Sequence, residues 1–497
     1  MDRQSVFRTR HPSPSGVKVS SDPNLSKFAT GSHDLPVSDA LAAYMATQWA
    51  PTPLAGLGPV PAAAWTPRRR AAVSARFPGE RLIVPAGIER LRSNDTFFRY
   101  RVHSAFAHLT GGQSLEGVLV FEPNGSGHEP VLFAHDRSSR ENGEAFRDRR
   151  LGELWEGRRP SLAESAELYG VQTENLNRLA DKLAGAGVAT RVLRGVDPRV
   201  DGLVAERPEA DAEFAAFLAE LRLVKDAWEI EQMQAAIDAT TLGFEDVART
   251  IPGVIGKPRG ERWVEGAFNT RARVEGNDVG YNTIVGGGSH ACVLHWTAND
   301  GTLNAGELLL LDAGVEVETL YTADITRTLP ISGTFTPVQR ELYELVLAAQ
   351  NAGIATLRAG ARFRDFHWAA MRTIASGLID MGVLKVSLEE AMDPEVGVYR
   401  RYTLCGSGHM LGIDVHDCAK ARAEEYVEGT LAAGNVLTVE PGLYLQPDDL
   451  TLPVELRGIG IRIEDDLLVT EEGSVLMSGG LPREVDEVEA WMAEHAG

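Results

Sequence analysis

The sequence predicts an α+β protein in which a smaller α/β domain precedes a larger C-terminal domain. The chain has 497 residues, a length that a single hydrophobic core rarely serves. Between residues 81 and 200, short β-branched runs alternate with helical patterns, which is typical of an α/β domain. Further on, strand-like runs gather into two blocks, 280–335 and 402–470, with helical patterns between the blocks. This grouping favours α+β architecture over a continuously alternating parallel sheet.

Residues 1–75 are expected to form an N-terminal extension that is partly disordered. Ser, Pro, Gly and charged residues dominate the first 35 positions, so little apolar surface is present to offset the entropy of ordering. A short helix is predicted at 39–49. Thr66-Pro67 then indicates a second helix start, because proline is favoured at the first helical position. The basic run Arg68-Arg69-Arg70 is expected on the solvated face of that helix.

Residues 76–224 are predicted to form the α/β domain. Runs rich in Val, Leu, Ile and Phe predict strands at 82–84, 117–121 and 130–133. Helical patterns follow at 162–169 and 174–184.

The C-terminal domain is predicted to span 225–497. An amphipathic helical pattern ends near Leu221, and a second long pattern begins near Ile230, so the boundary is placed between them. Two more helices are expected at 337–359 and 363–381, between the two strand-rich blocks.

Composition excludes several classes of function. Lys and Arg number 49 and Asp and Glu 70, giving a net charge of −21, so most of the surface would repel nucleic acid or an anionic membrane. Three cysteines are too few for a disulfide framework and lack the paired spacing of a zinc ribbon. No apolar stretch has the length of a secretory signal or a membrane span. These features predict a cytoplasmic protein without a nucleic-acid or membrane partner.

Five residues of the second half that can carry chemistry lie in or beside apolar strands, where charged side chains are least expected. They are Asp312, Asp324, His409, Glu440 and Glu464. Each has an ordinary explanation when taken alone, since a strand-end Asp can cap a turn and a strand Glu can pair with a neighbouring Arg. Together, four carboxylates in one apolar site could not all stay ionised without cations. Two divalent ions would balance the four charges, and oxygen-rich ligation with one imidazole suits a hard or borderline ion such as Mn²⁺.

The order of these residues, and the sequence around them, resembles the metallopeptidases of the pita-bread fold, and within them the aminopeptidase P (Xaa-Pro aminopeptidase) family. Prolidase, creatinase and methionine aminopeptidase are relatives. The resemblance covers about residues 225–476 and is carried by Ile284-Val285-Gly286, Leu294-His295-Trp296-Thr297, Asp312-Ala313-Gly314, Asp324-Ile325-Thr326-Arg327-Thr328, His409 to Asp417, Thr438 to Tyr444 and Gly460 to Asp466. A weaker resemblance, from Arg92 to Gly111, is to the creatinase-type N-terminal domain of that family.

The resemblance implies a pita-bread catalytic domain with two divalent metal ions. Asp312 would chelate one ion, Asp324 and Glu464 would each span both, and His409 with Glu440 would complete the second. It further implies release of the N-terminal residue from peptides with proline in second position, by attack of a metal-bridging hydroxide.

Catalytic roles beyond metal binding are also implied for a few residues. His295 and His416 would bind the scissile amide or the developing oxyanion, and Glu440 would shuttle the proton of the water. Arg462, with Tyr444, would orient Asp312.

The resemblance also implies an apolar slot for the proline ring. The imide nitrogen of proline has no hydrogen to donate, so the enzyme must recognise the ring by its apolar surface. Tyr281, His295 and Trp296 are candidates to line it. Two departures from the family pattern stand out: the interval from Asp312 to Asp324 is one residue longer, which implies a bulge or longer turn, and Cys405 replaces a cleft histidine.

A nucleotide-binding enzyme is disfavoured, because Gly286-Gly287-Gly288 and Gly458-Ile459-Gly460 lack the third glycine and the following helix of a dinucleotide loop. Three other functions share the predicted fold. Prolidase would share the metals but cleave only dipeptides, and creatinase would lack the metal ligands. A non-catalytic interaction module of the same fold is disfavoured, because all five ligand positions are filled. The resemblance also implies a peptide substrate and assembly into homodimers or homotetramers.

Overall fold

The computed structural model describes residues 37–94, 96–125, 127–138, 140–141, 143–184 and 187–495. The first 35 residues, which were expected to be disordered, lie outside the described residues. The chain divides into two compact units, one formed by 1–56 with 136–161 and the other by 57–135 with 162–497. The predicted domain boundaries at 75 and 224 are not tested by this division and stay predictions.

The described residues of the smaller unit form three short helices, α1 (Asp39–Met45), α4 (Glu144–Arg147) and α5 (Glu153–Glu156). Ser38 caps α1 by accepting a hydrogen bond from the backbone N–H of Leu41. The rings of Trp49 and Phe146 lie 6.3 Å apart, and the Arg158 guanidinium donates to the Thr52 carbonyl at 2.6 Å.

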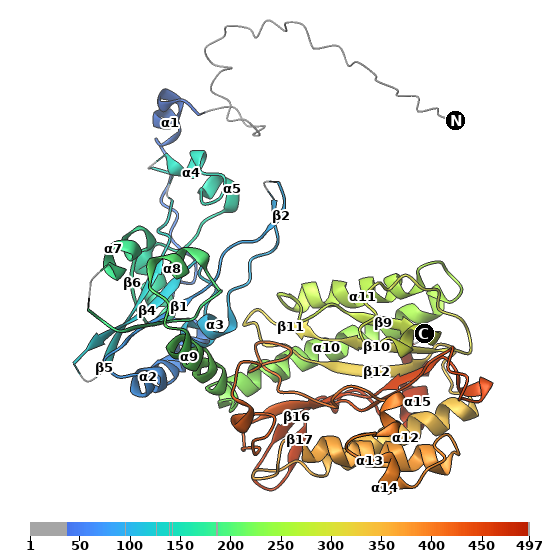
Figure 1. Ribbon diagram of the computed structural model, residues 1–497. Coiled ribbons are helices and arrows are strands. Elements are labelled where there is room, and N and C mark those ends of the chain that lie inside the picture. The colour runs from blue at the N-terminus through green and yellow to red at the C-terminus, as the bar shows by residue number, and fades with distance from the viewer. Residues whose placement is uncertain are drawn as a thin grey trace, which may run out of the picture. The chain divides into compact units, whose positions relative to one another are not determined.

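The larger unit begins with a five-stranded mixed sheet in the order β6-β5-β4-β1-β7 (Figure 1). β1, β4 and β5 are antiparallel, and β6 and β7 join the two edges in parallel. The strands are β1 (Arg81–Pro85), β4 (Val118–Asn124), β5 (Gly127–Ala134), β6 (Gln172–Asn175) and β7 (Thr190–Val192). The associated helices are α2 (Thr66–Arg76), α3 (Ser104–Thr110), α6 (Leu162–Tyr169), α7 (Leu179–Leu183), α8 (Pro198–Leu203) and α9 (Pro208–Glu220), with a small hairpin of β2 (Leu91–Ser93) and β3 (Thr96–Phe97).

Two sequence-based expectations for this region need correction. The helix predicted at 174–184 begins two residues later, as a 3₁₀ turn at Leu176–Arg178 that continues into α7, because Gln172–Asn175 pairs with β5 as an edge strand. In α2, Arg69 and Arg70 are buried rather than solvated, each 6% exposed. Arg69 pairs with Asp226 at 2.8 Å, and Arg70 donates to the Leu109 carbonyl at 3.0 Å. These partners come from other segments, so local periodicity could not show them.

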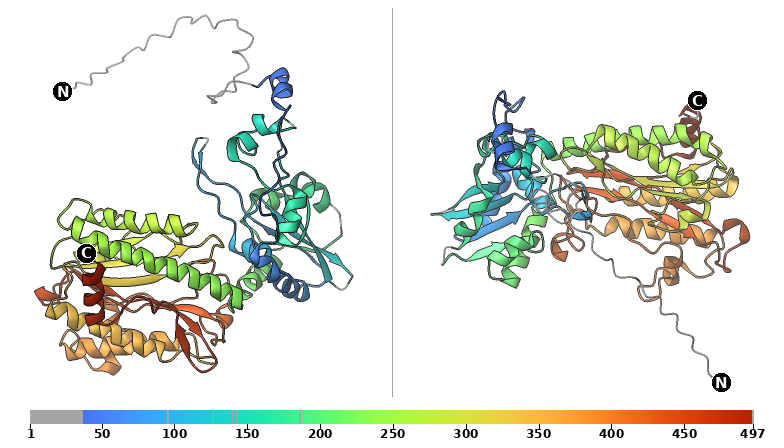
Figure 2. Two further views of the ribbon diagram at one scale, coloured as in Figure 1. Left: turned by 180° about the vertical axis from the view of Figure 1, so that it is seen from behind. Right: turned by 90° about the horizontal axis from the view of Figure 1, so that it is seen from above.

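In the C-terminal region, helices cover both sides of a layer of strands (Figures 1 and 2). α10 and α11 lie on one side, and α12 and α13 lie on the other. The helices are α10 (Ala227–Val254), α11 (Gly260–Glu275), α12 (Pro337–Ile354), α13 (Asp365–Asp380), α14 (Leu388–Ala391) and α15 (Val485–His495). Asp226 starts α10 with a capping box to Glu229, which explains why the helix begins there. Within the described residues, no helix has both the length and the apolar character needed to cross a membrane.

The strands of this region form small antiparallel sheets, β12-β10-β9, β13-β16-β17, β14-β15 and β11-β8. Their bounds are β8 (Asp278–Val279), β9 (Ile284–Gly287), β10 (Leu308–Ala313), β11 (Val315–Glu316), β12 (Ile325–Pro330), β13 (Val436–Val439), β14 (Gly442–Leu445), β15 (Ile459–Arg462), β16 (Asp465–Val469) and β17 (Ser474–Leu476). Helices and strands are thus grouped as the α+β prediction requires.

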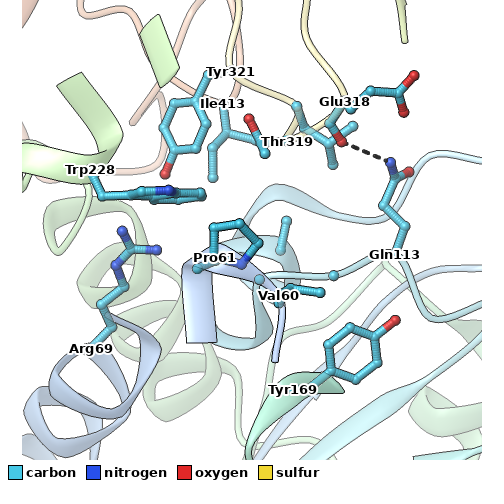
Figure 3. Close-up of a pocket in the computed structure, with 15 residues that line it drawn as sticks. Val60, Pro61, Arg69, Gln113, Tyr169, Trp228, Glu318, Thr319, Tyr321 and Ile413 are labelled. Carbon is cyan, nitrogen blue, oxygen red and sulfur yellow. Dashed lines mark hydrogen bonds between the residues drawn. The ribbon is translucent and has the colours of Figure 1, made fainter. Parts of the chain in front are cut away.

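A small pocket of about 290 Å³ lies where the five-stranded part of the larger unit contacts α10 (Figure 3). Trp228 and Tyr321 line one wall, and Pro61 and Tyr169 line the other. Beside it, the buried Glu229 carboxylate accepts from the Tyr321 hydroxyl at 2.8 Å and faces the Arg69 guanidinium at 3.5 Å. This network joins α2 to α10 through paired buried charges.

Candidate metal centre

The five predicted metal ligands lie at the ends of strands that meet in one place. Asp312 is in β10, and Asp324 directly precedes β12, its antiparallel neighbour. Glu464 lies between β15 and β16, and its backbone N–H donates to the Thr326 carbonyl at 3.1 Å. Glu440 follows β13. The Thr438 backbone N–H donates to the His409 carbonyl at 2.9 Å, and the His409 backbone N–H donates to the Thr438 hydroxyl at 3.1 Å, so the fifth residue is held beside that strand.

Side-chain distances connect all five residues. Ligand-type atoms of Asp324, His409 and Glu464 all lie within 4.8 Å of one another. His409 Nε2 is 3.2 Å from Asp324 Oδ2 and 3.4 Å from Glu440 Oε1. The Tyr281 hydroxyl lies 2.5 Å from both Asp312 Oδ1 and Asp324 Oδ1, which brings Asp312 into the same group.

The Arg462 guanidinium, from the end of β15, fixes the far side of Asp312. Its Nη2 donates to Asp312 Oδ2 at 2.6 Å, and its Nη1 donates to the Tyr444 hydroxyl at 3.0 Å. Its Nε donates to Thr326 Oγ1, which in turn donates to Glu464 Oε2 at 2.6 Å. One arginine therefore orients two of the five predicted ligands, one of them through a threonine.

The electrostatics of the site show an excess of buried negative charge. Burial raises the pKa of Asp312. Burial, together with repulsion from Asp324, raises the pKa of Glu440 to about 7 and that of Glu464 well above its usual range. Burial opposes protonation of His409, but Asp324 and Glu440 outweigh it and raise the pKa of His409 to about 9. Arg462 and His409 do not neutralise this charge, so the donor set fits divalent cations.

A cleft of about 620 Å³ opens onto this group. His295 and His416 line it, and the rings of His416 and His409 meet edge to face at 4.4 Å. Burial, followed by the charge of His409, lowers the pKa of His416. Apolar side chains of Ile284, Leu294 and Val415 complete the walls.

The proline-slot candidates are only partly found in the cleft. Tyr281 and His295 line it. The prediction for Trp296 is wrong: this residue stacks on His290 at 3.9 Å and donates its Nε1–H to Glu261 at 2.9 Å, away from the cleft. The buried Glu261 carboxylate draws the indole toward α11, a contact that the neighbouring residues in the sequence do not indicate.

The two departures noted in the sequence have clear positions. The longer interval between Asp312 and Asp324 forms a turn after β11, in which Leu320 has a left-handed backbone with φ of +71°. Cys405 lines the cleft as a free thiol, and burial raises its pKa.

Sequence reasoning missed three residues that support the ligands. Tyr281 was considered only as a wall of the proline slot, although its hydroxyl contacts two carboxylates. Thr326 links Arg462 to Glu464. The buried Asp466 accepts from the Asp324 backbone N–H at 3.2 Å, while its Oδ1 has no hydrogen-bond partner among the described residues. Thr326 and Asp466 lie within the family motifs, each two positions after a predicted ligand. A polar residue at such a position in an apolar strand was the sequence feature that could have identified them as supporting residues.

Comparisons with known proteins agree with this geometry. The model of metallopeptidase family M24 matches residues 231–471, and that of the aminopeptidase P N-terminal domain matches residues 66–192. The chain is 53% identical over 463 residues to Xaa-Pro aminopeptidase 1 of Streptomyces coelicolor, and the aligned region covers 93% of each chain.

Solved structures show the same similarity. The aminopeptidase PepP of Pseudomonas aeruginosa superposes with a TM-score of 0.78 at 31% identity, covering 88% of this chain and 99% of that one. Aminopeptidase P of Escherichia coli with the inhibitor Pro-Leu superposes with a TM-score of 0.75 at 30% identity, covering 87% and 98%. The resemblance drawn from the motifs and the predicted fold class are thereby confirmed, and the chain belongs to metallopeptidase family M24, in its aminopeptidase P branch.

Proposed function

We propose that this protein is a metal-dependent Xaa-Pro aminopeptidase, which releases the first residue of peptides that carry proline in second position. One observation carries the proposal: a single cleft contains four carboxylates, one ligand-type imidazole and two further histidines, in a chain that is 53% identical to a Xaa-Pro aminopeptidase.

Asp312, Asp324, His409, Glu440 and Glu464 would hold two divalent ions, with Mn²⁺ as the proposed metal. Support comes from the donor set, since four carboxylates and one imidazole favour a hard or borderline ion. When bound, such ions supply Lewis-acid polarisation of the scissile carbonyl and lower the pKa of a water. Uncompensated buried negative charge raises the pKa values of Glu440 and Glu464, and bound cations would compensate this charge.

The other cleft residues would bind and position the peptide. His295 and His416 would donate hydrogen bonds to the scissile amide or to the oxygen that gains charge in the transition state. Glu440 would accept a proton from the attacking water and return it to the leaving proline nitrogen. Arg462 would act by holding Asp312 in place, as their 2.6 Å contact supports.

Proline selection would follow from the apolar part of the cleft. The imide nitrogen of proline has no hydrogen to donate. A site that recognises the proline ring by apolar contacts therefore does not need a hydrogen bond from this nitrogen. Ile284, Leu294, Val415 and the Tyr281 ring supply suitable walls.

Three further properties belong to the same proposal. The protein would act in the cytoplasm, as its low cysteine content favours. It would assemble as a homodimer or homotetramer, which sedimentation velocity at micromolar concentration can measure. Strict dipeptide cleavage, as in prolidase, is the alternative function.

The test combines metal analysis with a peptide panel. Protein stripped by a chelator should be inactive, and Mn²⁺ should restore cleavage of an Xaa-Pro-Pro peptide. Asp324→Ala should lower kcat/KM by roughly a thousandfold or more, because one of the proposed metal ligands is lost. Asp448→Ala, which removes an exposed carboxylate outside the cleft, is the matched control and should keep full activity.

Substrate length then separates the two candidate functions. Cleavage of Xaa-Pro dipeptides alone would establish prolidase activity. Undiminished proline-directed cleavage after chelation would rule out the metal mechanism.

A further inference from the structure

A second cavity, of about 280 Å³, adjoins the catalytic cleft. Its walls come from the start of α13, from the 3₁₀ turn Val398–Arg401 and from the segment 403–406. Arg364 and Arg400 both line it, so it is called the arginine pocket here.

The two cavities share lining residues at Cys405 and Gly406. A Cβ built on Gly406 would meet no atom within 4 Å, so the boundary between the cavities is open at that residue. A peptide chain that leaves the catalytic cleft over Gly406 would therefore enter the arginine pocket without a steric barrier from this position.

The pocket is locally cationic in a protein whose net charge is −21. Arg364 and Arg400 are exposed. Within the described parts of the chain, neither forms an ion pair with an acidic side chain, and Arg364 uses its Nε to donate to the Val427 carbonyl. Asp393 also lines the pocket, but its Oδ1 already accepts from the backbone N–H groups of Glu395 and Val396.

Two further features favour an anionic peptide segment. The positive end of the α13 dipole lies at Arg364 and His367, where it attracts an anion, although the Asp365 carboxylate in the same first turn offsets part of this attraction. Trp368 and Leu404, 48% and 66% exposed, offer apolar surface beside the charges. Burial lowers the pKa of His367, which hydrogen-bonds Ser407 at 3.0 Å and so contributes no fixed charge near pH 7.

We propose that the arginine pocket binds the part of the substrate that follows the proline, and that Arg364 and Arg400 hold a carboxylate there. This inference rests on the proposed Xaa-Pro aminopeptidase activity and adds a substrate class to it: short peptides with an anionic group shortly after the proline. The carboxylate comes from the C-terminus of a short peptide or from an acidic side chain, and both bind guanidinium in the same way.

The test uses the Mn²⁺-loaded full-length protein and four peptides: Ala-Pro-Ala-Ala as the free acid, its C-terminal amide, and the amides Ala-Pro-Ala-Glu and Ala-Pro-Ala-Gln. The wild type should cleave the free acid with a kcat/KM about tenfold higher than the amide, mainly through a lower KM, as expected for a charge-assisted contact. Preference for Glu over Gln in the amide pair, with no acid-over-amide preference, would assign the carboxylate to a side chain.

Arg364→Gln and Arg400→Gln should each reduce this preference to about threefold or less, whereas Arg400→Lys should retain part of it. Arg372→Gln, on the same helix but outside the pocket lining, is the matched control for the loss of one positive charge. Cleavage of the plain amide should fall much less than cleavage of the free acid in the two arginine variants, because that peptide has no carboxylate for the arginines.

The outcomes separate the two proposals. If the wild type cleaves the peptides and the arginine variants keep its full preference for the peptide with a carboxylate, the pocket proposal is overturned and the proposed function stands. Equal weakening of Ala-Pro dipeptide cleavage would also overturn it, since the arginines would then bind the proline's own carboxylate. A wild type that cleaves none of the Xaa-Pro peptides would overturn both.

Discussion

The protonation of single residues depends on both neighbouring and distant parts of the chain, and His103 is an example outside the metal centre. It precedes α3 and caps the helix, since its Nδ1 accepts from the Ala105 backbone N–H at 3.2 Å. A protonated imidazole could not accept this bond. Burial, followed by the charge of Arg222, lowers the pKa of His103 to about 4.

This cap predicts a pH dependence of stability. Between pH 6.5 and pH 4, the unfolded chain binds a proton at His103 that the folded protein does not bind, so the free energy of unfolding falls as the pH falls. The shift corresponds to roughly 2 to 3 kcal/mol once pH 4 is reached. His103→Asn keeps a capping side chain that does not titrate. As the pH falls from 6.5 to 4, the stability of this variant relative to the wild type should therefore rise in urea titrations. A constant difference between the two proteins from pH 7 to pH 4.5 would contradict the prediction.

The same dependence on distant partners holds at the metal centre. Asp312 reaches its orientation through Arg462, 150 positions away, and Asp324 through the Asp466 carboxylate, 142 positions away. The residue type determines the chemistry of each side chain, whereas contacts with distant segments determine its orientation.

At the scale of elements, the turn from β10 to β12 positions two of the predicted ligands. Gly314 lies just after Asp312, and its carbonyl accepts from the Gly280 backbone N–H at 2.9 Å. A Cβ at Gly314 would lie 1.8 Å from the Ala323 carbonyl oxygen and 3.1 Å from the Tyr281 ring. Only glycine permits the close approach of these two segments.

Gly314→Ala should therefore destabilise the protein and displace the ligands. The contact is with backbone, which cannot move aside cheaply, so a loss of about 3 kcal/mol is expected in urea unfolding, together with a large loss of peptidase activity and bound metal. Gly266→Ala is the matched control: it lies inside α11 with no atom within 4 Å of the added carbon. That variant should gain about 0.5 to 1 kcal/mol. Wild-type stability and metal content in Gly314→Ala would refute this account of the turn.

For the whole molecule, the buried charge of the metal centre couples ion binding to stability. Strands from both blocks bring the carboxylates together, namely β10 and β12 with β13, β15 and β16, so the repulsion between the carboxylates opposes the packing of these strands.

Metal removal should lower the melting temperature of the protein. Free metal at about 100 times its Kd stabilises the folded state by about 2.7 kcal/mol per site, so Mn²⁺ should raise Tm by several degrees over chelated protein in calorimetry. Glu464→Ala should respond much less, because a proposed metal ligand is missing, while Asp448→Ala should respond as the wild type does. Equal Tm values with and without Mn²⁺ would show that the site does not bind the ion.

Much of the fold and of the candidate site could be predicted from sequence. Apolar runs predicted the central strands of the first sheet, and amphipathic periodicity predicted α9, α10, α12 and α13, because both patterns depend on covalent neighbours. The five ligand-type residues were identifiable because charged groups in apolar strands are costly and therefore conspicuous.

Only the tertiary structure decided which of these residues meet and what surrounds them. It buried Arg69 and Arg70, turned Trp296 away from the cleft toward Glu261, and joined the cleft to a pocket with two arginines at Gly406. Each outcome depends on segments tens to hundreds of residues away. The sequence by itself determined where most of the strands and helices and the candidate metal-binding side chains lie along the chain, because those depend on local periodicity and residue chemistry. The orientation of the side chains and the shape of the cleft follow from packing between distant segments, which no local pattern encodes.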